Sequence, residues 1–513
     1  VLGPRESGEG PSITEAVAER MAAVAEIYQR IIHSEQQQKG KDEPGSDFRL
    51  RSALAEIGRE LSYDQILHRL AVDSPPLYEI ASRRELSSHA RRNLHRFLSA
   101  AFTSSERYAA VTRSPESVED ALRLFSVSDY LTDILVRHPE EIAAIAELSK
   151  RPSGKPEAAL FEAGQETGEG GKHDAVFAHI AQAPESYGEK LAVLRRHYRH
   201  RVFASGARDL LEFRPVEESL AEMTAVADDA LGAAASIAAL PAGFAVLALG
   251  RLGTREFDLA SDADLLFVRD PGLETGAAQK AAAQMVEVLS AYTREGTVFA
   301  VDPRLRPRGG EGELVITPEL LRGYFATEAQ PWEALTYTKL RGVAGCRELA
   351  ERARAAVNEG LPRFASDAGF AEAVREMRAR LEKSENGEFN FKTVAGGFYD
   401  IDFIVSYLVV RRGAPEVRGT IGEKLHALAA RGWMSDNDCA TLDSSAELLR
   451  TLEHVLRLVT GRARKFLPAS EQAREAVERL IGKMLGREPA GGLEAELDRI
   501  FKKVREAYER LLS

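Results

Sequence analysis

The chain has 513 residues, of which 44% are hydrophobic and 29% are charged, and a chain of this length is expected to form two to four domains rather than one. Its 68 basic residues are outnumbered by 79 acidic ones, and the net charge of −11 argues against nucleic acid as the main partner. Only two cysteines, Cys346 and Cys439, are present, which excludes a disulfide framework and a Cys-rich zinc site.

No apolar run approaches the length of a membrane-spanning helix, and the first ten residues, VLGPRESGEG, contain no hydrophobic signal core. With the low cysteine content, this predicts a cytoplasmic protein that does not engage a membrane. The chain begins with Val rather than Met, as a processed, trimmed or partial chain does.

The N-terminal part is predicted to be helical. Residues 1–13 are polar and glycine-rich, residues 13–32 show helical periodicity, and residues 34–47 are too polar to bury anything and indicate a loop. Helix follows helix over residues 48–150. Ser114 and Pro115 suit an N-cap and first helical position, Ser126 or Ser128 the next cap, and Pro139 a helix end, while the core face is predicted to hold Leu131, Ile134 and Leu135.

A polar loop over residues 151–174 is expected to lead into a helix over residues 189–211. His197 and His200 have the i, i+3 spacing of a metal-binding pair, but the arginines around them disfavour a metal and favour a solvated basic helix face. The alanine-rich helix over residues 216–240 is expected to pack against a sheet.

The next stretch carries the chemistry. Phe244–Leu249 is a short apolar run typical of a buried strand, and a glycine-punctuated turn, Gly250–Gly253, follows it. Asp262 and Asp264 then lead into a second strand over residues 265–268. Because side chains alternate across a strand, these two carboxylates are expected to share one face.

A helix over residues 275–293 separates these strands from a third one, residues 298–301, which ends at Asp302. If the third strand pairs beside the second, the three carboxylates converge at one edge of the sheet. Like charges at such distances need a counter-ion, and two Mg²⁺ ions that clamp the oxygens of an in-line displacement would supply it. The alternative is a solvated strand end with an ordinary cap.

Cationic side chains follow the carboxylates. Arg304 and Arg306 alternate with apolar residues after Asp302, so they either bind phosphate oxygens or neutralise the carboxylates. Lys339 and Arg341 are predicted to lie, with Trp332 and Glu333, on the next helix and to contact phosphate. A capped surface helix would have the same pattern.

From residue 367 to the end the chain is predicted to be helical, with Asp400 and Asp402 on a helix that follows Gly396 and Gly397. The bundle core is expected to include Val455, Leu458 and Val459.

Four stretches resemble, in the same order, the catalytic modules of the glutamine synthetase adenylyltransferase family, which are polymerase-β-like nucleotidyltransferases. They are GRLGTREFDLASDADLLF at Gly250, VDPRLRPRGGEGELVIT at Val301, PWEALTYTKLRGVAG at Pro331 and FNFKTVAGGFYDIDFIVSYLVVRRG at Phe389. Where the family usually carries a glutamate, this chain has Asp402. The Phe-x-x-Lys before the paired glycines is more similar to the adenylylating than to the adenylyl-removing module, and one module is present where familiar members carry two.

The resemblance implies an α+β, mostly α, fold in which a mixed nucleotidyltransferase sheet (residues 189–366) lies between helical regions (residues 1–188 and 367–513). It implies an enzyme of nitrogen metabolism that uses ATP, or AMP and phosphate, with two Mg²⁺ ions, that modifies a tyrosine of glutamine synthetase or reverses this, and that has a PII-type signalling protein as a further partner. The helical flanks are expected to dock the target. The implied metal-binding and catalytic residues are Asp262, Asp264 and Asp302, and the implied nucleotide-binding residues are Gly250, Gly253, Ser261, Arg304, Arg306, Lys339 and Arg341.

Three alternatives remain open at this point. A single-module relative would modify another protein, and a regulatory protein would retain the fold without catalysis, although all three aspartates are present. A nucleotidyltransferase for small molecules or nucleic acids would share the site, but the acidic balance and the large helical flanks count against it.

Overall fold

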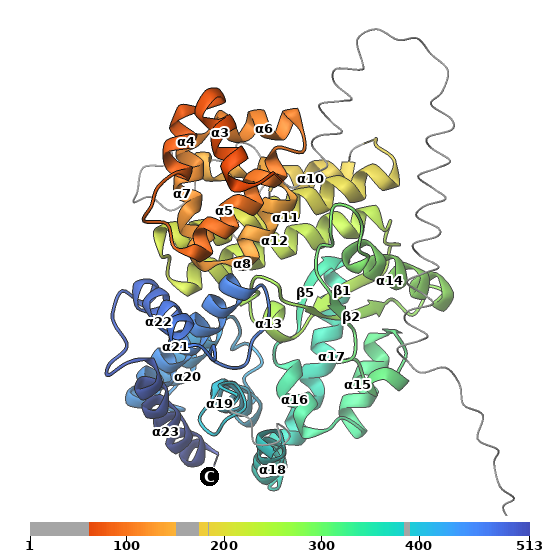
Figure 1. The fold of residues 1–513 in the computed structure, drawn as a ribbon. Coiled ribbons are helices and arrows are strands. Elements are labelled where there is room, and N and C mark those ends of the chain that lie inside the picture. Colours follow the sequence, from red (N-terminus) through yellow and green to blue (C-terminus); the bar gives the residue numbers. More distant parts are fainter. Residues whose placement is uncertain (1–60, 150–173, 183, 384–389, 513) are drawn as a thin grey trace, which may run out of the picture. The chain divides into compact units, whose positions relative to one another are not determined.

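A computed structural model of the protein describes residues 61–149, 174–182, 184–383 and 390–512 (Figure 1). The predictions for residues 1–60 and for the loop over residues 151–173 lie outside these ranges. All the elements below belong to one compact unit, Ser62–Ser513. Helices surround a five-stranded mixed sheet in this unit, which confirms the predicted α+β, mostly α, class.

The N-terminal part is helical, as predicted. Ser62 begins α3 with a capping box, and Ser128 caps α8 by accepting a hydrogen bond from the Leu131 amide. Ser114 is the N-cap residue of α7, although its side chain makes no capping hydrogen bond. The elements are α3 (Tyr63–Asp73), α4 (Pro75–Ala81), α5 (Ser88–Ala101), α6 (Ser105–Thr112), α7 (Pro115–Val127), α8 (Asp129–Arg137), η1 (Pro139–Glu141), α9 (Ile142–Ser149) and α10 (Ala175–Gln182).

Two long helices, α11 (Tyr187–Glu212) and α12 (Val216–Ile237), connect this part to the sheet. The solvated basic face predicted around His197 and His200 is wrong. Arg195 is 1% exposed, and both histidines face acidic partners: the ring of His197 lies 2.9 Å from Asp174, and that of His200 lies 2.8 Å from Glu141. The neighbouring helices supply the charge that solvent was expected to screen.

The sheet has the order β3-β2-β1-β5, with β4 pairing with the same edge of β2 as a separate short strand. Pairing is antiparallel between β1 and β2 and between β1 and β5, and parallel between β2 and both β3 and β4. The predicted third strand is shorter and later than expected, because pairing begins only at Val301. The strands are β1 (Phe244–Ala248), β2 (Ala263–Arg269), β3 (Val301–Asp302), β4 (Val315–Ile316) and β5 (Arg341–Gly345).

The predicted strand–strand–helix–strand order is confirmed, with α13 (Gly250–Gly253) between β1 and β2 and α14 (Thr275–Ser290) before β3. The placement of Lys339 and Arg341 on one helix with Trp332 and Glu333 is wrong. Helix α16 (Pro331–Tyr337) ends before Lys339, and Arg341 opens β5, whose residues pair with β1. The remaining elements of this part are η2 (Gly309–Glu311), α15 (Pro318–Thr327) and α17 (Arg347–Ser366).

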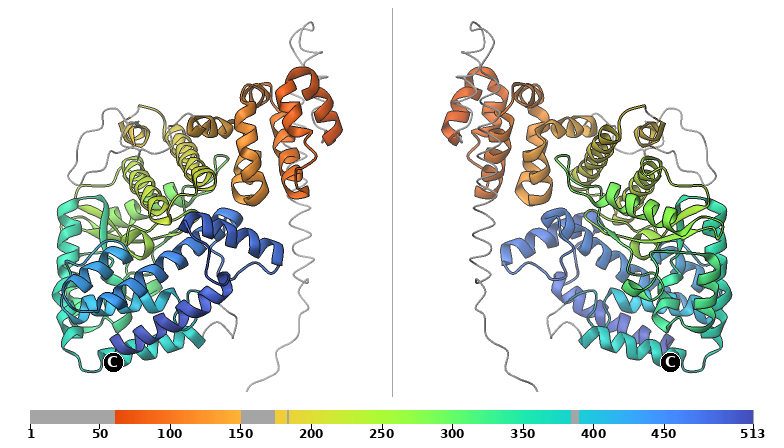
Figure 2. Two further views of the ribbon diagram at one scale, coloured as in Figure 1. Left: turned by 90° about the vertical axis from the view of Figure 1, so that its left-hand side faces the viewer. Right: turned by 90° about the vertical axis from the view of Figure 1, so that its right-hand side faces the viewer.

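The C-terminal part is helical, and its longest helix, α21 (Asp436–Thr460), packs against both α8 and α12 (Figure 2). The first and last parts of the unit therefore meet next to the sheet. Val455 and Leu458 are buried in α21, as predicted. Among the described helices, none combines the length and apolar content needed to cross a bilayer. The other helices are α18 (Phe370–Lys383), α19 (Phe398–Arg411), α20 (Ile421–Ala430), α22 (Glu471–Leu485) and α23 (Leu493–Leu511).

Candidate active site

Three aspartates lie at the edge of the sheet where β2 and β3 begin to pair. Asp264 and Asp302 are directly opposite each other in the parallel register, and Asp262 immediately precedes β2. Asp262 is exposed and Asp264 half-buried, while Ala263 and Leu265 are buried, which is the alternation that the sequence predicted. The strand pairing thus brings Asp264 next to Asp302, although 38 positions of the chain separate them.

The electrostatics of the site reflect this crowding of carboxylates. Burial, followed by the negative charges of Asp262 and Asp302, raises the pKa of Asp264 to about 6, although Lys339 and Arg304 act in the opposite direction. Hydrogen bonding to Arg304 lowers the pKa of Asp302. A cation bound at the site would therefore stabilise the ionised form of Asp264.

Arg304 supplies a counter-ion to the third aspartate. Its Nε donates to both carboxylate oxygens of Asp302, at 2.9 and 3.0 Å, and its own side chain is 79% exposed. Within the described ranges, no three His, Cys, Asp or Glu side chains already surround one point as metal ligands do. The three aspartates nevertheless fit Mg²⁺, because they supply hard carboxylate oxygens and because the raised pKa of Asp264 shows that negative charge is crowded there.

The glycine-rich turn packs directly against these carboxylates. Gly250 begins α13 with φ of +54°, and a Cβ atom there would lie 2.1 Å from Oδ2 of Asp264. A Cβ atom on Gly253 would lie 2.3 Å from the carbonyl oxygen of Lys339. Both positions need glycine because the backbone of the turn approaches Asp264 and the segment before β5 more closely than any side chain permits.

Ser261 is the one predicted nucleotide-binding residue with a buried orphan atom. The residue is 5% exposed, and its Oγ has no hydrogen-bond partner among the described residues. An unpaired buried hydroxyl costs free energy that a ligand can recover by bonding to it. Ser261 precedes Asp262, so such a ligand would lie beside the carboxylates.

The other predicted phosphate-binding cations already have partners in the protein. Lys339 Nζ lies 2.5 Å from Oδ2 of Asp402, the residue at which this chain departs from the family pattern. Arg341 donates to both carboxylate oxygens of Asp228, at 2.8 and 2.9 Å, and also to the carbonyl of Leu252.

Arg306 is engaged as well, because its guanidinium donates to carbonyl groups of its own loop, those of Pro303, Gly310 and Gly312. The geometry therefore favours a structural role for Arg306 and Arg341. It leaves Lys339 and Arg304, whose partners are carboxylates at the site itself, as the cations that can exchange a carboxylate for a phosphate.

A buried ionic cluster that the sequence analysis missed holds the turn in place. Arg251 pairs with Glu453 at 2.7 Å, and Glu256 pairs with Arg450 at 2.9 Å. Arg457 donates to the carbonyls of Leu259 and Ala260, at 2.9 Å each. The C-terminal helix α21 thus anchors the whole segment between α13 and β2.

His454 of α21 completes this cluster. Its ring lies 2.7 Å from Asp258 and 3.1 Å from Asp209 of α11, and all three side chains are fully buried. The two carboxylates outweigh the effect of burial and raise the pKa of His454 to about 9, so the ring is charged at neutral pH. The stretch LRTLEHVLRLVT carries charged residues every three to four positions, so they lie on one face of the helix. This spacing indicates a charged face that could have predicted the cluster, but the sequence analysis used only the apolar pattern of the helix.

Two protein-family models match the chain. Residues 118–356 match a family model described as glutamate-ammonia ligase adenylyltransferase, and residues 368–512 match one described as GlnD PII-uridylyltransferase. The first match contains the sheet, the three aspartates and the glycine-rich turn, and the second begins near the start of the C-terminal helices.

Curated relatives carry the name bifunctional glutamine synthetase adenylyltransferase/adenylyl-removing enzyme. The one from Streptomyces avermitilis is 30% identical over 76% of this chain and 39% of its own length. Those from Nocardia farcinica and Chromobacterium violaceum are 32% and 28% identical, over 63% and 86% of this chain and 34% and 49% of their own lengths. The chain spans less than half the length of each of these relatives.

Proposed function

We propose that this protein is a metal-dependent protein nucleotidyltransferase that transfers AMP from ATP to a tyrosine of glutamine synthetase, since residues 118–356 match the family model described as glutamate-ammonia ligase adenylyltransferase. The observation that carries the proposal is the convergence of Asp262, Asp264 and Asp302 beside a glycine-rich turn, with the pKa of Asp264 raised to about 6. Such a cluster is suited to holding cations against a triphosphate.

The residues divide into two groups in this proposal. Asp262, Asp264 and Asp302 would hold two Mg²⁺ ions, which when bound would polarise the phosphate oxygens and neutralise the charge of the departing pyrophosphate. Gly250 and Gly253 let the backbone approach the triphosphate, and Ser261 offers its unpaired hydroxyl. Lys339 would exchange Asp402 for a phosphate oxygen.

The transfer itself is a single displacement at phosphorus. The tyrosine oxygen attacks the α-phosphorus of ATP, its proton passes to Asp302, and the bond between the α-phosphorus and the bridging oxygen breaks to release pyrophosphate. For this step Arg304 must leave Asp302, which its high exposure allows. Removal of AMP would be a different displacement, in which inorganic phosphate attacks the phosphorus of the AMP–tyrosine group, the bond from phosphorus to the tyrosine oxygen breaks, and ADP and the free tyrosine are released.

We favour the adenylylating direction, because the Phe389–Lys392 segment before Gly396 and Gly397 resembles the adenylylating module. The C-terminal match to a PII-uridylyltransferase model supports a PII-type protein as a further partner of residues 368–512. A different target protein is the second candidate, since the chain spans only part of its relatives.

The test is incubation of the protein with Mg²⁺, ATP labelled at the α-phosphate and unmodified glutamine synthetase. Label on the target together with one pyrophosphate per transfer is the expected result. Adenylylated glutamine synthetase with phosphate, yielding ADP instead, would reverse the assigned direction. Label on neither protein, from a preparation that binds ATP with Mg²⁺, would exclude glutamine synthetase as the target.

A further inference from the structure

A large pocket opens beside Asp262, the first of the three aspartates. Its volume is about 1190 Å³, and its walls come from α6, α8, α11 and the segment before β3. Ser261 and Asp262 line it, whereas Gly250, Gly253 and Lys339 do not. The pocket is therefore a second approach to Asp262, and Ser261 lies where the pocket meets the proposed nucleotide site.

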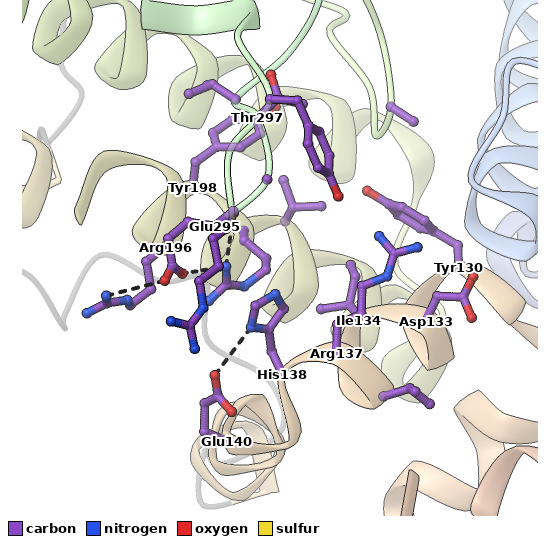
Figure 3. Close-up of a pocket in the computed structure, with 18 of the residues that line it drawn as sticks. Tyr130, Asp133, Ile134, Arg137, His138, Glu140, Arg196, Tyr198, Glu295 and Thr297 are labelled. Atoms are coloured by element: carbon purple, nitrogen blue, oxygen red, sulfur yellow. Dashed lines mark hydrogen bonds and ion pairs between the residues drawn. The ribbon is translucent and has the colours of Figure 1, made fainter. Parts of the chain in front are cut away.

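The walls of the pocket are amphipathic. Figure 3 shows Tyr130, Ile134 and Arg137 of α8 on one side and Arg196 and Glu295 on the other. Tyr198 and Phe299 contact each other edge to face in a third wall, with ring centroids 5.7 Å apart. Burial, followed by the nearby Asp258 carboxylate, raises the pKa of Tyr130 to about 12, so its phenol stays neutral and available as a hydrogen-bond donor.

Two of the five arginines that line the pocket lack a carboxylate partner, although carboxylates line it as well, those of Glu106, Asp133, Glu140, Asp262 and Glu295. Arg107, Arg196 and Arg199 have glutamate partners. Arg137 and Arg294 are exposed, and neither makes an ion pair or hydrogen bond with any residue that the structure describes. Two guanidinium groups without carboxylates, above an aromatic wall, favour an anionic ligand with aromatic character.

The size of the pocket suits a segment of polypeptide as its occupant. Pockets for small molecules usually measure roughly 300–1,000 Å³, and this one is larger and open to solvent. An extended stretch of polypeptide fits such a space and can reach Asp262, which lines it.

We propose that this pocket receives the acceptor segment of the target protein: an extended, acidic stretch whose tyrosine side chain passes Tyr130 and Tyr198 and presents its hydroxyl at Ser261 and Asp262. This inference rests on the proposed function and adds the place where the acceptor binds. Arg137 and Arg294 pair with acidic residues that flank the tyrosine.

The kinetic test compares Arg137→Glu and Arg294→Glu with Arg347→Glu, a matched exposed arginine at the start of α17. Each pocket variant is expected to raise the KM for unmodified glutamine synthetase at least about 10-fold, because reversal sets like charges against the acidic segment. The KM for ATP is expected to stay within about twofold of wild type, and Arg347→Glu should change neither constant.

A cross-linking test measures whether the target binds in the same pocket, and it does not depend on catalysis. A photoreactive amino acid replaces Tyr292, which is 76% exposed at the pocket, or Val72 of α3, which is 77% exposed, as the control. Glutamine synthetase should be cross-linked from position 292 and not from position 72.

The outcomes separate the two proposals. If the wild-type protein labels glutamine synthetase but the pocket variants keep its KM, and position 292 yields no cross-link, the acceptor pocket is wrong and the function stands. If the wild-type protein transfers no label, the proposed function fails, and cross-linking then decides alone whether the pocket binds this protein.

Discussion

The imidazole of His454 lies 2.7 Å from the carboxylate of Asp258, although 196 positions of the chain separate the two residues. Asp258 belongs to the segment between α13 and β2, and His454 to α21, so this contact joins the C-terminal helices to the segment that leads into Asp262 and Asp264. Asp209 of α11 accepts from the other side of the ring. One buried cation therefore holds together three parts of the fold.

We expect this cation to make stability depend on pH. The pKa of His454 is raised from 6.5 to about 9, so the folded protein retains a proton that the unfolded chain releases. The stabilisation is fully present below pH 6.5 and is lost as the pH rises through about 9. His454→Gln should lower the thermal midpoint most at pH 6 and progressively less toward pH 9, as its deficit in the free energy of unfolding shrinks by on the order of 3 kcal/mol.

The control for this series is His426→Gln, because His426 lies exposed on α20. Its thermal midpoint should follow that of the wild type at each pH. A His454→Gln protein whose deficit stays constant from pH 6 to pH 9 would show that the ring is neutral in the folded protein.

A second prediction concerns Asp264. Asp264→Asn should reduce AMP transfer by at least about 100-fold, because a carboxylate at the centre of the proposed metal site is lost. It should also abolish the rise in thermal midpoint that Mg²⁺ and ATP together produce in the wild-type protein. Calorimetric scans with and without both ligands measure this effect independently of turnover.

The same substitution should stabilise the ligand-free protein. A carboxyl group whose folded pKa is raised contributes stability at low pH and loses it as the pH rises through about 6. Above pH 7, Asp264→Asn should therefore increase the free energy of unfolding by on the order of 1 kcal/mol, and at pH 4 by much less. Lower stability of the variant at pH 8 without ligands would contradict the crowding of charge at this site.

A third prediction distinguishes the roles of Lys339 and Arg341, which the sequence analysis expected to lie on one helix. Lys339→Met should weaken ATP binding about 10-fold with little effect on the thermal midpoint, since its only assigned partner is Asp402. Arg341→Gln should instead destabilise the protein by about 2 kcal/mol, because it leaves Asp228 and the Leu252 carbonyl without their donor. Calorimetric titration with ATP and thermal scans of both variants distinguish these effects, and equal losses of affinity would place both side chains at the nucleotide.

A fourth prediction concerns the boundary expected near residue 366. A fragment of residues 189–366 should fail to give a cooperative melting transition, because it lacks the α21 side chains that pair with Arg251, Glu256 and Asp258. The full chain under the same conditions is the control. A fragment that melts cooperatively and binds ATP with Mg²⁺ would show that the catalytic part is independent of the C-terminal helices.

Local patterns predicted the elements that local chemistry determines. The apolar run Phe244–Leu249, the glycines after it and the alternation around Asp262 and Asp264 were enough to predict two strands and a shared carboxylate face. The convergence with Asp302 followed from assuming that the third strand pairs beside the second, which the parallel pairing of β2 and β3 confirms.

Features that depend on distant partners were not predicted. The sequence near Arg341 does not show that β5 pairs with β1, so local patterns predict a helix there. The pairing with β1 determines the extended conformation of Arg341. The basic face around His197 was assigned to solvent for the same reason, since Asp174 and Glu141 become its neighbours only in the folded chain. Charge on a helix indicates exposure only when no other element brings the opposite charge to it.

The anchoring of the glycine-rich turn by α21 also sets an order of events during synthesis. β1 and β2 are close in sequence and can pair soon after they leave the ribosome, because closing a short loop costs little entropy. The anchoring partners in α21 emerge only after about 200 further residues have been made, and these partners are Glu453 for Arg251, Arg450 for Glu256 and His454 for Asp258. A nascent chain can therefore pair β1 and β2 early, but its glycine-rich turn is held in place only when α21 has been made.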